Sequence, residues 1–557
     1  MANQTNKPVF ELGLTLAGAA SSAAYTAGVL DMLFSALQAW EASNPPHHVR
    51  LAAISGTSSG GMGAALMAAV LSSTTDGGKI KGSPFFDAIV EGDDCVDVEH
   101  LLMRKDIEKE RGKLYSLCDT SKIEKVAIKR LTEFTATCEK PPYVADPLRI
   151  FIPVTNLQGI PYGIPARGST SGTGYEMSLR ADHVQFLLTW SSTLQAPEGI
   201  VLDANNAESP GWKQLCEVAL ASGAYPLVLK PRRLKIKAET YQQREWTIAL
   251  EQPSAGTCHE VDTIPPAWNK SKDDLVDFWA LDGGITNNEP FELVRCALAS
   301  RKAVKRNPRE GDKADRAVIM IDPIQESASP KPPDRISILG TAVDVILSLH
   351  AQAQFKMEEL ELARKEDCYS RFIIAPVRRP NGQDKKPVPY PLATAGLGGF
   401  AGFLDKELRR HDFELGRYNC QRFLRQHFVL PDGPPGQVNK LFSQWNNTLN
   451  KNDFTVVQGS KNHLPIIPLV GNAANTVKHP ADWPKVRERR LEEIRGPLGN
   501  RLDAVVPRLR GQLGIGTCGC FNITIKLVWL MLRGIVVDTI LDQVREGLRQ
   551  RKQYEES

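Results

Sequence analysis

Residues 51–71 read LAAISGTSSGGMGAALMAAVL, and this stretch decides the fold. Its first part, Leu51 to Ser55, has the length and apolar character of a buried strand, and Met62 to Leu71 has those of an apolar helix. The glycines and serines between them are typical of a tight turn. The stretch therefore predicts a strand that turns sharply into a helix.

A similar strand, turn and helix precede this stretch. Val9 to Leu16 predicts the strand, Gly18 to Ala23 the turn and Ala24 to Trp40 the helix. Two such units in succession indicate a parallel sheet. Later strands are expected at residues 149–156, 227–237, 279–281 and 317–321. We therefore expect an α/β core with a mainly parallel central sheet that closes near Pro323.

The rest of the chain divides into an insertion and two C-terminal regions. Within a core at 1–330, residues 76–145 carry many charges and lack strand-like alternation, so we expect a helical insertion and a candidate lid. Residues 331–430 predict an α/β extension packed on the core, with a long helix at 337–365 and a strand at 369–377. Residues 431–557 follow a proline-rich break at 431–435 and predict a mostly helical region.

The composition is that of a globular protein. Hydrophobic residues make up 42% and charged residues 24% of the chain, and the mean hydropathy is −0.26. The ten cysteines lack the spacing of a zinc or thioredoxin-like site, which favours a reducing compartment. We expect a cytoplasmic protein without a transmembrane segment or clear signal peptide, and without a metal or other cofactor.

The net charge of +4 lies in the C-terminal tail. From residue 480 onward there are 14 Lys and Arg against 10 Asp and Glu, a difference of +4, so the preceding 479 residues sum to zero. Apolar residues three and four apart in this tail predict an amphipathic helix, with its stripe at Leu527, Leu530, Gly534, Val537, Leu541, Val544 and Leu548. Such a helix either packs on its own core or also contacts a membrane surface or a partner. We expect no nucleic-acid partner.

Ser58 is the candidate nucleophile, because residues 56–60 match the G-x-S-x-G turn that lifts a serine hydroxyl out of a sheet. Gly56 and Gly60 suit this turn, since a Cβ at either position would collide with the neighbouring strand or helix. The alternative frame on Ser59 would place Thr57 where a glycine is needed. The same five-residue pattern also occurs by chance in loops rich in glycine and serine.

A serine hydroxyl needs a base to accept its proton, and Asp282 is the candidate. None of the ten histidines lies in a local pattern that marks a catalytic residue. Asp282 ends an expected strand, and Gly283 and Gly284 after it allow its carboxylate to approach another backbone segment. The alternative interpretation is an aspartate that only starts a turn.

The turn after the first strand is suited to hold the oxyanion that forms when an ester is attacked. Its small residues can present the backbone amides of Gly18, Ala19 and Ala20. A turn of this kind could instead bind a nucleotide phosphate, but it lacks the G-x-G-x-x-G pattern and the lysine of the P-loop.

Taken together, these motifs resemble the patatin-like phospholipases. That family has a glycine-rich oxyanion loop on the first βα turn, G-x-S-x-G on the second, and Asp-Gly-Gly far downstream. Here these correspond to residues 16–30, residues 56–60 and Asp282 to Gly284, with Asn287-Asn288-Glu289-Pro290 after them. An intermediate Ala-Ser-x-Ala-x-Pro block is similar to residues 221–226. The resemblance covers residues 9 to about 323.

The resemblance implies a patatin-type three-layer α/β core and a Ser-Asp dyad of Ser58 and Asp282, without histidine or metal. The implied substrate is a phospholipid or another acyl-ester lipid, cleaved through an acyl-enzyme. The family's loop usually reads Gly-Gly-Gly-x-Arg/Lys-Gly, whereas this chain has Ala19, Ala20 and Ser22 at three of those positions. Residues 392–420 look like an extension found in some bacterial members.

Two other functions stay open at this point. The chain could be an α/β-hydrolase esterase with a Ser-His-Asp triad, although such enzymes place several strands before the nucleophile and Ser58 follows about two. It could also be a non-catalytic relative that binds a membrane or a protein.

Overall fold

The computed structural model describes residues 7–75, 79–80, 82–164, 175–252, 256–301, 307–323, 367–379, 390–433, 438–445, 450–458, 461–480, 482–512 and 519–556, together with isolated residues between 341 and 388. The helix expected at 337–365 and part of the proline-rich break at 431–435 lie outside the described residues.

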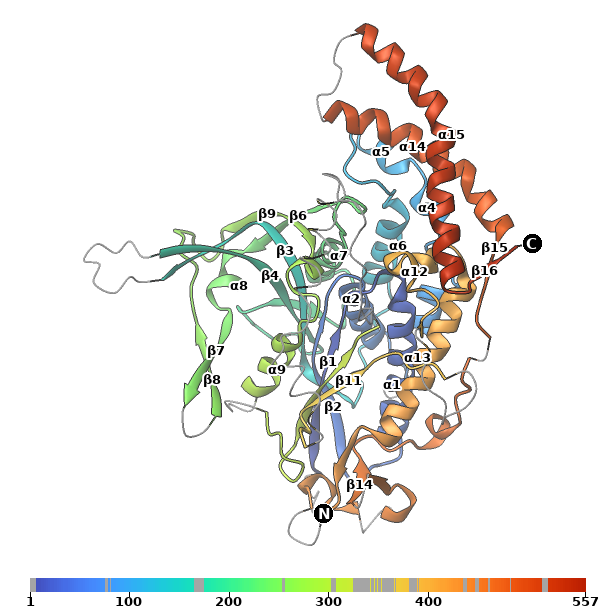
Figure 1. Cartoon of the computed structure of the whole chain (residues 1–557). Helices are drawn as coiled ribbons and strands as arrows, with labels where there is room; N and C mark the ends of the chain where they lie inside the picture. The colour runs from blue at the N-terminus through green and yellow to red at the C-terminus, as the bar shows by residue number, and fades with distance from the viewer. Residues whose placement is uncertain are drawn as a thin grey trace.

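A nine-stranded sheet forms the centre of the described part of the chain (Figure 1). Its main path runs β11-β10-β1-β2-β3-β4-β5, while β9 pairs with β3 and β6 pairs with β9. Neighbours from β11 to β3 are parallel, and so are β4 and β5, whereas the pairs β3–β4, β3–β9 and β6–β9 are antiparallel. The expected α/β class with a mainly parallel sheet is thus confirmed. The strands are β1 (Val9–Leu16), β2 (His48–Gly56), β3 (Val144–Ile164), β4 (Tyr175–Thr189), β5 (Ile200–Asp203), β6 (Arg232–Lys237), β9 (Leu275–Asp282), β10 (Arg316–Ile321) and β11 (Arg371–Ile374).

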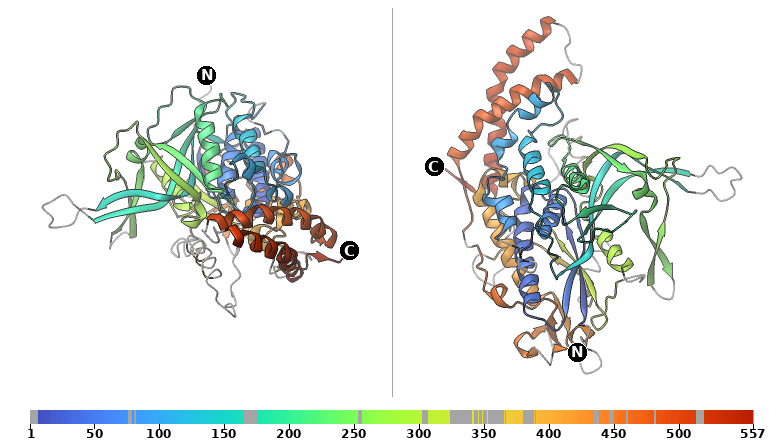
Figure 2. Two further views of the ribbon diagram at one scale, coloured as in Figure 1. Left: turned by 90° about the horizontal axis from the view of Figure 1, so that it is seen from above. Right: turned by 180° about the vertical axis from the view of Figure 1, so that it is seen from behind.

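Helices cover both faces of this sheet (Figure 2). Side chains of β10 show why: Ile319 and Ile321 belong to the large core, whereas Val318 and Met320 point to the other face and pack on α9. A strand buried on both sides has apolar residues at every position. The helices of the large core are α1 (Ala23–Ala42), α2 (Ser59–Ser72), α7 (Pro210–Ser222) and α13 (Lys406–Gln426), and α9 spans Phe291–Ser300.

The insertion after α2 is helical, as expected, in short pieces. These are α3 (Pro84–Phe86), a π-helical turn at Asp87–Glu91, α4 (Val98–Leu101), α5 (Lys105–Lys109) and α6 (Ser121–Thr132). Two smaller elements lie beside the sheet: the hairpin of β7 (Glu245–Gln252) with β8 (Gly256–Thr263), and α8 (Ala238–Gln242).

Two expectations about the sheet were wrong. The strand expected from residue 227 begins only at Arg232, because Leu227 has a φ of +65° and the Leu229 amide closes a turn onto the Tyr225 carbonyl. The sheet also does not close near Pro323, because β11 pairs in parallel with β10 and shields it from solvent. Since α13 packs against α1, part of the expected extension is built into the core.

The region after residue 430 is helical only in its last part. Its first part contains a three-stranded sheet, in the order β12 (Val429–Pro431), β14 (Lys461–Pro465) and β13 (Val456–Gln458). Two long helices follow, α14 (Glu488–Gln512) and α15 (Gly519–Gln550), and a short pair of β15 (Val486–Arg487) with β16 (Tyr554–Glu555) closes the region.

The two C-terminal helices form a hairpin that projects beyond the sheet and lies on the insertion (Figures 1 and 2). Arg501 of α14 is buried and forms a bidentate pair with Asp106, at 2.6 and 2.9 Å. Its remaining donors bond the carbonyls of Met103, Ser116 and Leu117. One arginine therefore joins the hairpin to four residues of the insertion.

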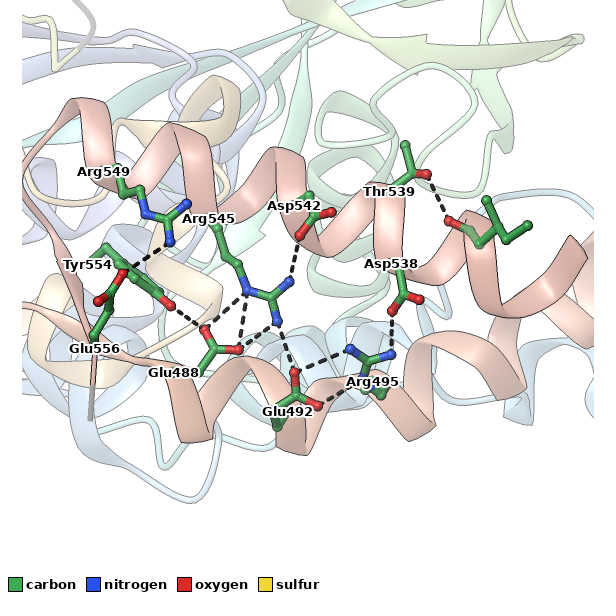
Figure 3. A network of polar contacts seen from close by, with 11 residues as sticks. Glu488, Glu492, Arg495, Asp538, Thr539, Asp542, Arg545, Arg549, Tyr554 and Glu556 are labelled. Atoms are coloured by element: carbon green, nitrogen blue, oxygen red, sulfur yellow. Dashed lines mark hydrogen bonds and ion pairs between the residues drawn. The ribbon is translucent and has the colours of Figure 1, made fainter.

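Ion pairs hold the two helices of this hairpin to each other. Figure 3 shows Arg545 of α15 bonded to Glu488 at 2.6 Å and to Glu492 at 2.9 Å, with Tyr554 donating to the same Glu488 carboxylate. These hydrogen bonds, Arg545 first, lower the pKa of Glu488 to about 2. The pairs therefore join the two helices, while the net charge of the tail, in which both glutamates are already counted, stays at +4.

The apolar stripe of α15 is buried at Val537, Leu541 and Leu548, so this half packs on the protein itself. The side chains of Leu527 and Leu530 lie outside the described residues. None of the described helices combines the length and the apolar character that a membrane crossing requires.

The first two βα turns touch backbone to backbone. A Cβ added at Gly60 would lie 2.3 Å from the Leu16 carbonyl oxygen, and one at Gly56 would lie 2.2 Å from the Gly60 carbonyl oxygen. No side chain fits at such distances. The end of β1 and the start of α2 are thus pressed together at the carboxyl edge of the sheet.

We predict that Gly60→Ala lowers the free energy of unfolding by at least about 1–3 kcal/mol, because the methyl group must displace the β1 backbone. Gly63→Ala is the matched control, since a Cβ there would meet only Leu16 Cδ1 at 3.5 Å. Alanine in that helix interior should be neutral or stabilising by up to about 1 kcal/mol. Thermal unfolding followed by circular dichroism measures both, and equal midpoints would contradict the steric argument.

We also predict that Arg501→Met destabilises the chain by roughly 3–5 kcal/mol, because it leaves Asp106 in the interior without its partner. The double variant Arg501→Met with Asp106→Leu should recover much of that loss. Arg489→Met is the control, because the Arg489 side chain is 85% exposed in its pair with Glu493 and should contribute less than about 0.5 kcal/mol. Urea unfolding gives the ranking, and a loss in Arg489→Met as large as in Arg501→Met would refute it.

Candidate active site

Ser58 stands at the end of β2 in a strained backbone conformation. Its φ is 55° and its ψ is −125°, a combination that side-chain-bearing residues rarely adopt. The residue caps α2 and is partly exposed to solvent. Strain of this kind persists only where the surroundings impose it, and it is typical of functional sites.

Ser222 at the end of α7 helps to impose this conformation. The Ser58 amide donates to the Ser222 hydroxyl at 3.0 Å, and that hydroxyl donates to the Pro153 carbonyl at 2.7 Å. Ser222 is completely buried. It thus links the nucleophile turn to β3.

Asp282 ends β9 and accepts a hydrogen bond from Ser58. The Ser58 hydroxyl donates to Asp282 Oδ2 at 2.7 Å, and the Gly284 amide donates to Oδ1 at 2.7 Å. The Asp282 amide donates to the Ala224 carbonyl at 3.0 Å. Gly283 is required here, because a Cβ would lie 2.4 Å from the Pro153 carbonyl oxygen. Both oxygens of the carboxylate are therefore oriented.

Burial raises the pKa of the Asp282 carboxyl group. Asp282 is only 2% exposed, and its desolvation raises its pKa to about 6 against the opposing effect of the hydrogen bonds from Ser58 and Gly284. A carboxylate with a pKa near 6 is ionised at neutral pH and still basic enough to accept a proton. Among the described residues, no histidine hydrogen-bonds either Ser58 or Asp282.

The turn after β1 lies directly against the nucleophile. A Cβ added at Gly18 would be 2.9 Å from Ser58 Cβ, so this loop and the serine are in contact. Within the part of the chain that the structure describes, the amides of Gly18 and Ala20 have no protein acceptor. The Ala19 amide differs, because it donates to the Ser59 hydroxyl at 3.0 Å. Two of the three expected amides are therefore free to bind an oxyanion.

Asn288 is a residue of the site to which the sequence assigned no role. It is 2% exposed, and its Oδ1 lies 2.6 Å from the position of a Cβ on Gly18, without a hydrogen-bond partner among the described residues. The segment that carries it is tied to the nucleophile turn, since the Thr57 hydroxyl donates to the Asn287 carbonyl at 2.9 Å. In the sequence, only its position shortly after Asp282-Gly283-Gly284 could have indicated that Asn288 belongs to the site.

Two exposed leucines lie on segments that adjoin the parts of the site. Leu227 is three residues after Ala224, whose carbonyl accepts from the Asp282 amide. Leu397 is two residues before Gly399, which packs on the Ala19 carbonyl. Leu227 is 62% exposed and Leu397 is 38% exposed, and both have a positive φ, of 65° and 55°. The rings of Tyr225 and Phe400, with centroids 6.1 Å apart, join the segments that carry them. A cavity of about 1030 Å³ lies elsewhere, along the C-terminal half of α1, and does not include Ser58.

No group of three or more His, Cys, Asp or Glu residues within the described ranges is arranged to hold a metal ion.

Comparison with known proteins places the chain in a family. No family model matches it. It is similar to the "Uncharacterized protein y4iI" of Sinorhizobium fredii (strain NBRC 101917 / NGR234), with 31% identity over 610 residues, covering 99% of this chain and 83% of that protein. The chain therefore belongs to the same family as protein y4iI.

Proposed function

We propose that the chain is a serine lipid acyl-hydrolase of the patatin-like type, in which Ser58 is the nucleophile and Asp282 its base. One observation carries the proposal: the 2.7 Å hydrogen bond from the Ser58 hydroxyl to Asp282 Oδ2, made from a strained turn. When a serine hydroxyl already donates a hydrogen bond to an oriented carboxylate, that carboxylate can accept its proton directly, without a histidine between them.

The arrangement supports acyl transfer in two steps. Ser58 Oγ bonds to the acyl carbon while its proton passes to Asp282, and the carbonyl oxygen becomes an oxyanion. The amides of Gly18 and Ala20 would stabilise that charge. The oxyanion then collapses, the alcohol leaves with the proton from Asp282, and an acyl-enzyme remains. Water attacks this ester with Asp282 again as base, which releases the fatty acid and restores Ser58.

Two features support a lipid ester as the substrate class. Leu227 and Leu397 are exposed apolar side chains on segments next to Asp282 and to the oxyanion loop, and they would suit an acyl chain better than a polar substrate. The order of the parts also supports a patatin-type core, because the oxyanion loop follows β1, the nucleophile follows β2 and the aspartate ends β9.

We predict that Ser58→Ala abolishes release of fatty acid from phospholipid vesicles and of p-nitrophenol from a short acyl ester, with a loss of at least about 10³-fold. A fluorophosphonate probe should label the wild-type chain on Ser58 and fail on Ser58→Ala. Ser59→Ala is the matched neighbour and should still be labelled. Labelling or turnover that survives in a folded Ser58→Ala protein would refute the assignment.

The raised pKa of Asp282 predicts the pH dependence. The ionised carboxylate is the active form, so kcat/KM for a neutral ester should be constant above about pH 7 and fall about tenfold per pH unit below pH 6. Asp282→Asn has no carboxylate to titrate and should lose most activity at every pH. A flat profile between pH 4.5 and 8 would contradict a carboxylate base with this pKa.

A further inference from the structure

The side chains of the oxyanion loop are held by residues nearly four hundred positions away. Ser22 is completely buried, and its hydroxyl lies 2.9 Å from the Thr394 hydroxyl. The Thr394 hydroxyl in turn lies 2.5 Å from Oδ2 of Asp412 on α13. A hydroxyl carries one proton and a carboxylate can only accept, so Thr394 donates to Asp412 and accepts from Ser22.

Asp412 is a buried carboxylate that is saturated by donors. It has no exposed surface, and the amides of Ala393 and Thr394 donate to its two oxygens at 2.8 Å each. Nδ1 of His411 lies 2.8 Å from Oδ1. With the Thr394 hydroxyl, four donors surround one carboxylate. The position of Thr394 is therefore defined by its backbone as well as by its side chain.

Ser21 makes a second connection to the same segment. Its hydroxyl donates to the Gly399 carbonyl and accepts from the Gly402 amide at 3.0 Å. Gly399 has a φ of 90°, and a Cβ on it would lie 3.1 Å from the Ala19 carbonyl oxygen. These residues belong to α12 (Gly396–Gly399) and to the following 3-10 turn, Ala401–Phe403, so the segment lies against the loop backbone.

The loop needs such external support because of its own sequence. Ala20 has a φ of 46°, in the left-handed region that alanine disfavours. Its amide and that of Gly18 are the two free donors, and catalytic donors must hold their positions within about 0.5 Å. Hydrogen bonds on Ser21 and Ser22, the next two residues, fix the backbone that carries them.

We propose that Thr394 and Asp412 are positioning residues for the oxyanion loop, acting through Ser22, an inference that rests on the proposed acyl-hydrolase function. Neither residue touches the reacting atoms. Their contribution is to keep the Gly18 and Ala20 amides aimed at the developing charge.

The test compares Thr394→Val, which removes the hydroxyl and keeps the shape, with Thr394→Ser, which keeps the hydroxyl. On p-nitrophenyl butyrate, Thr394→Val should lower kcat about 10–100-fold with KM within about threefold, a part of the 10²–10³-fold effect of deleting an oxyanion donor. Thr394→Ser should stay within about threefold of wild type. Binding of an alkyl trifluoromethyl ketone, which forms an oxyanion on Ser58, should weaken in Thr394→Val in proportion to kcat/KM.

A control variant separates positioning from stability. Thr74→Val removes another buried hydroxyl, which donates to the Glu139 carbonyl at 3.0 Å. The hydrogen bonds that this hydroxyl donates do not involve the oxyanion loop. Thr74→Val should lower the thermal midpoint to a similar extent and leave kcat unchanged. The pH midpoint near 6 should persist in Thr394→Val, because the Ser58–Asp282 pair is untouched. If Thr394→Val does not fold, Ser22→Ala removes the same hydrogen bond by deleting its donor. It should likewise lower kcat and leave KM nearly unchanged.

Failure of this inference can be told from failure of the proposed function. A wild-type chain without Ser58-dependent turnover would overturn both. An active wild type with an undiminished kcat in Thr394→Val or Ser22→Ala would overturn the positioning role alone. The positioning role would also be overturned if active-site titration showed that the lower activity comes from a smaller number of active sites, each working at the wild-type rate.

Discussion

The backbone contact between the end of β1 and the start of α2 is the constraint on which the site depends. Gly60 lies so close to the Leu16 carbonyl that no side chain fits between them. This contact places the loop after β1 against the residue after β2, and it brings Gly18 to Ser58. A parallel sheet collects the carboxyl ends of its strands at one edge, but only close packing there brings two turns within the reach of one substrate atom. The geometry of the nucleophile and of the amide donors is thus set by the same glycine.

Asp282, the third part of the site, lies on a strand that is antiparallel to its neighbour β3. Asp282 lies 224 residues beyond Ser58, on β9, which pairs with β3 at Val154↔Asp282. Because β3 is the parallel neighbour of β2, the end of β9 reaches the same edge from the opposite direction. Pro153 and Gly283 touch at this crossing, and Ser222 bonds the Pro153 carbonyl while it holds the Ser58 amide. One segment of β3 therefore supports both Asp282 and Ser58, and Asp282 is buried enough for its pKa to be raised.

The sequence predicted those parts of the molecule that are encoded locally. The strands at 9–16 and 316–321, the turns at Gly18 and Ser58, and the aspartate before two glycines each have a signature within a few residues. Ser222, Asn288, Thr394 and Asp412 have none, because their contacts join positions distant in the chain and their residue types are common in loops and helices. The sheet of β12 to β14 was missed for a related reason, and the strand expected at 369–377 was found as β11 although its pairing with β10 was not foreseen. Such short strands are recognised by their pairing partners, which periodicity cannot reveal.

The extension and the hairpin after the core differ in how they use charge. The hairpin pairs many of its arginines with carboxylates of its own two helices and of the insertion, so these arginines hold the hairpin together and to the insertion. Asp412 in the extension is held directly by four hydrogen bonds, and the charges of Arg378 and Arg551 act on it without a direct hydrogen bond. A buried carboxylate of that kind is expensive, and an apolar residue of similar shape would often be as stable. Its position next to a loop that contains an alanine at positive φ gives a physical reason for it. A stiffer loop with one strained alanine requires an anchor outside itself, and a carboxylate held by four donors is a rigid one.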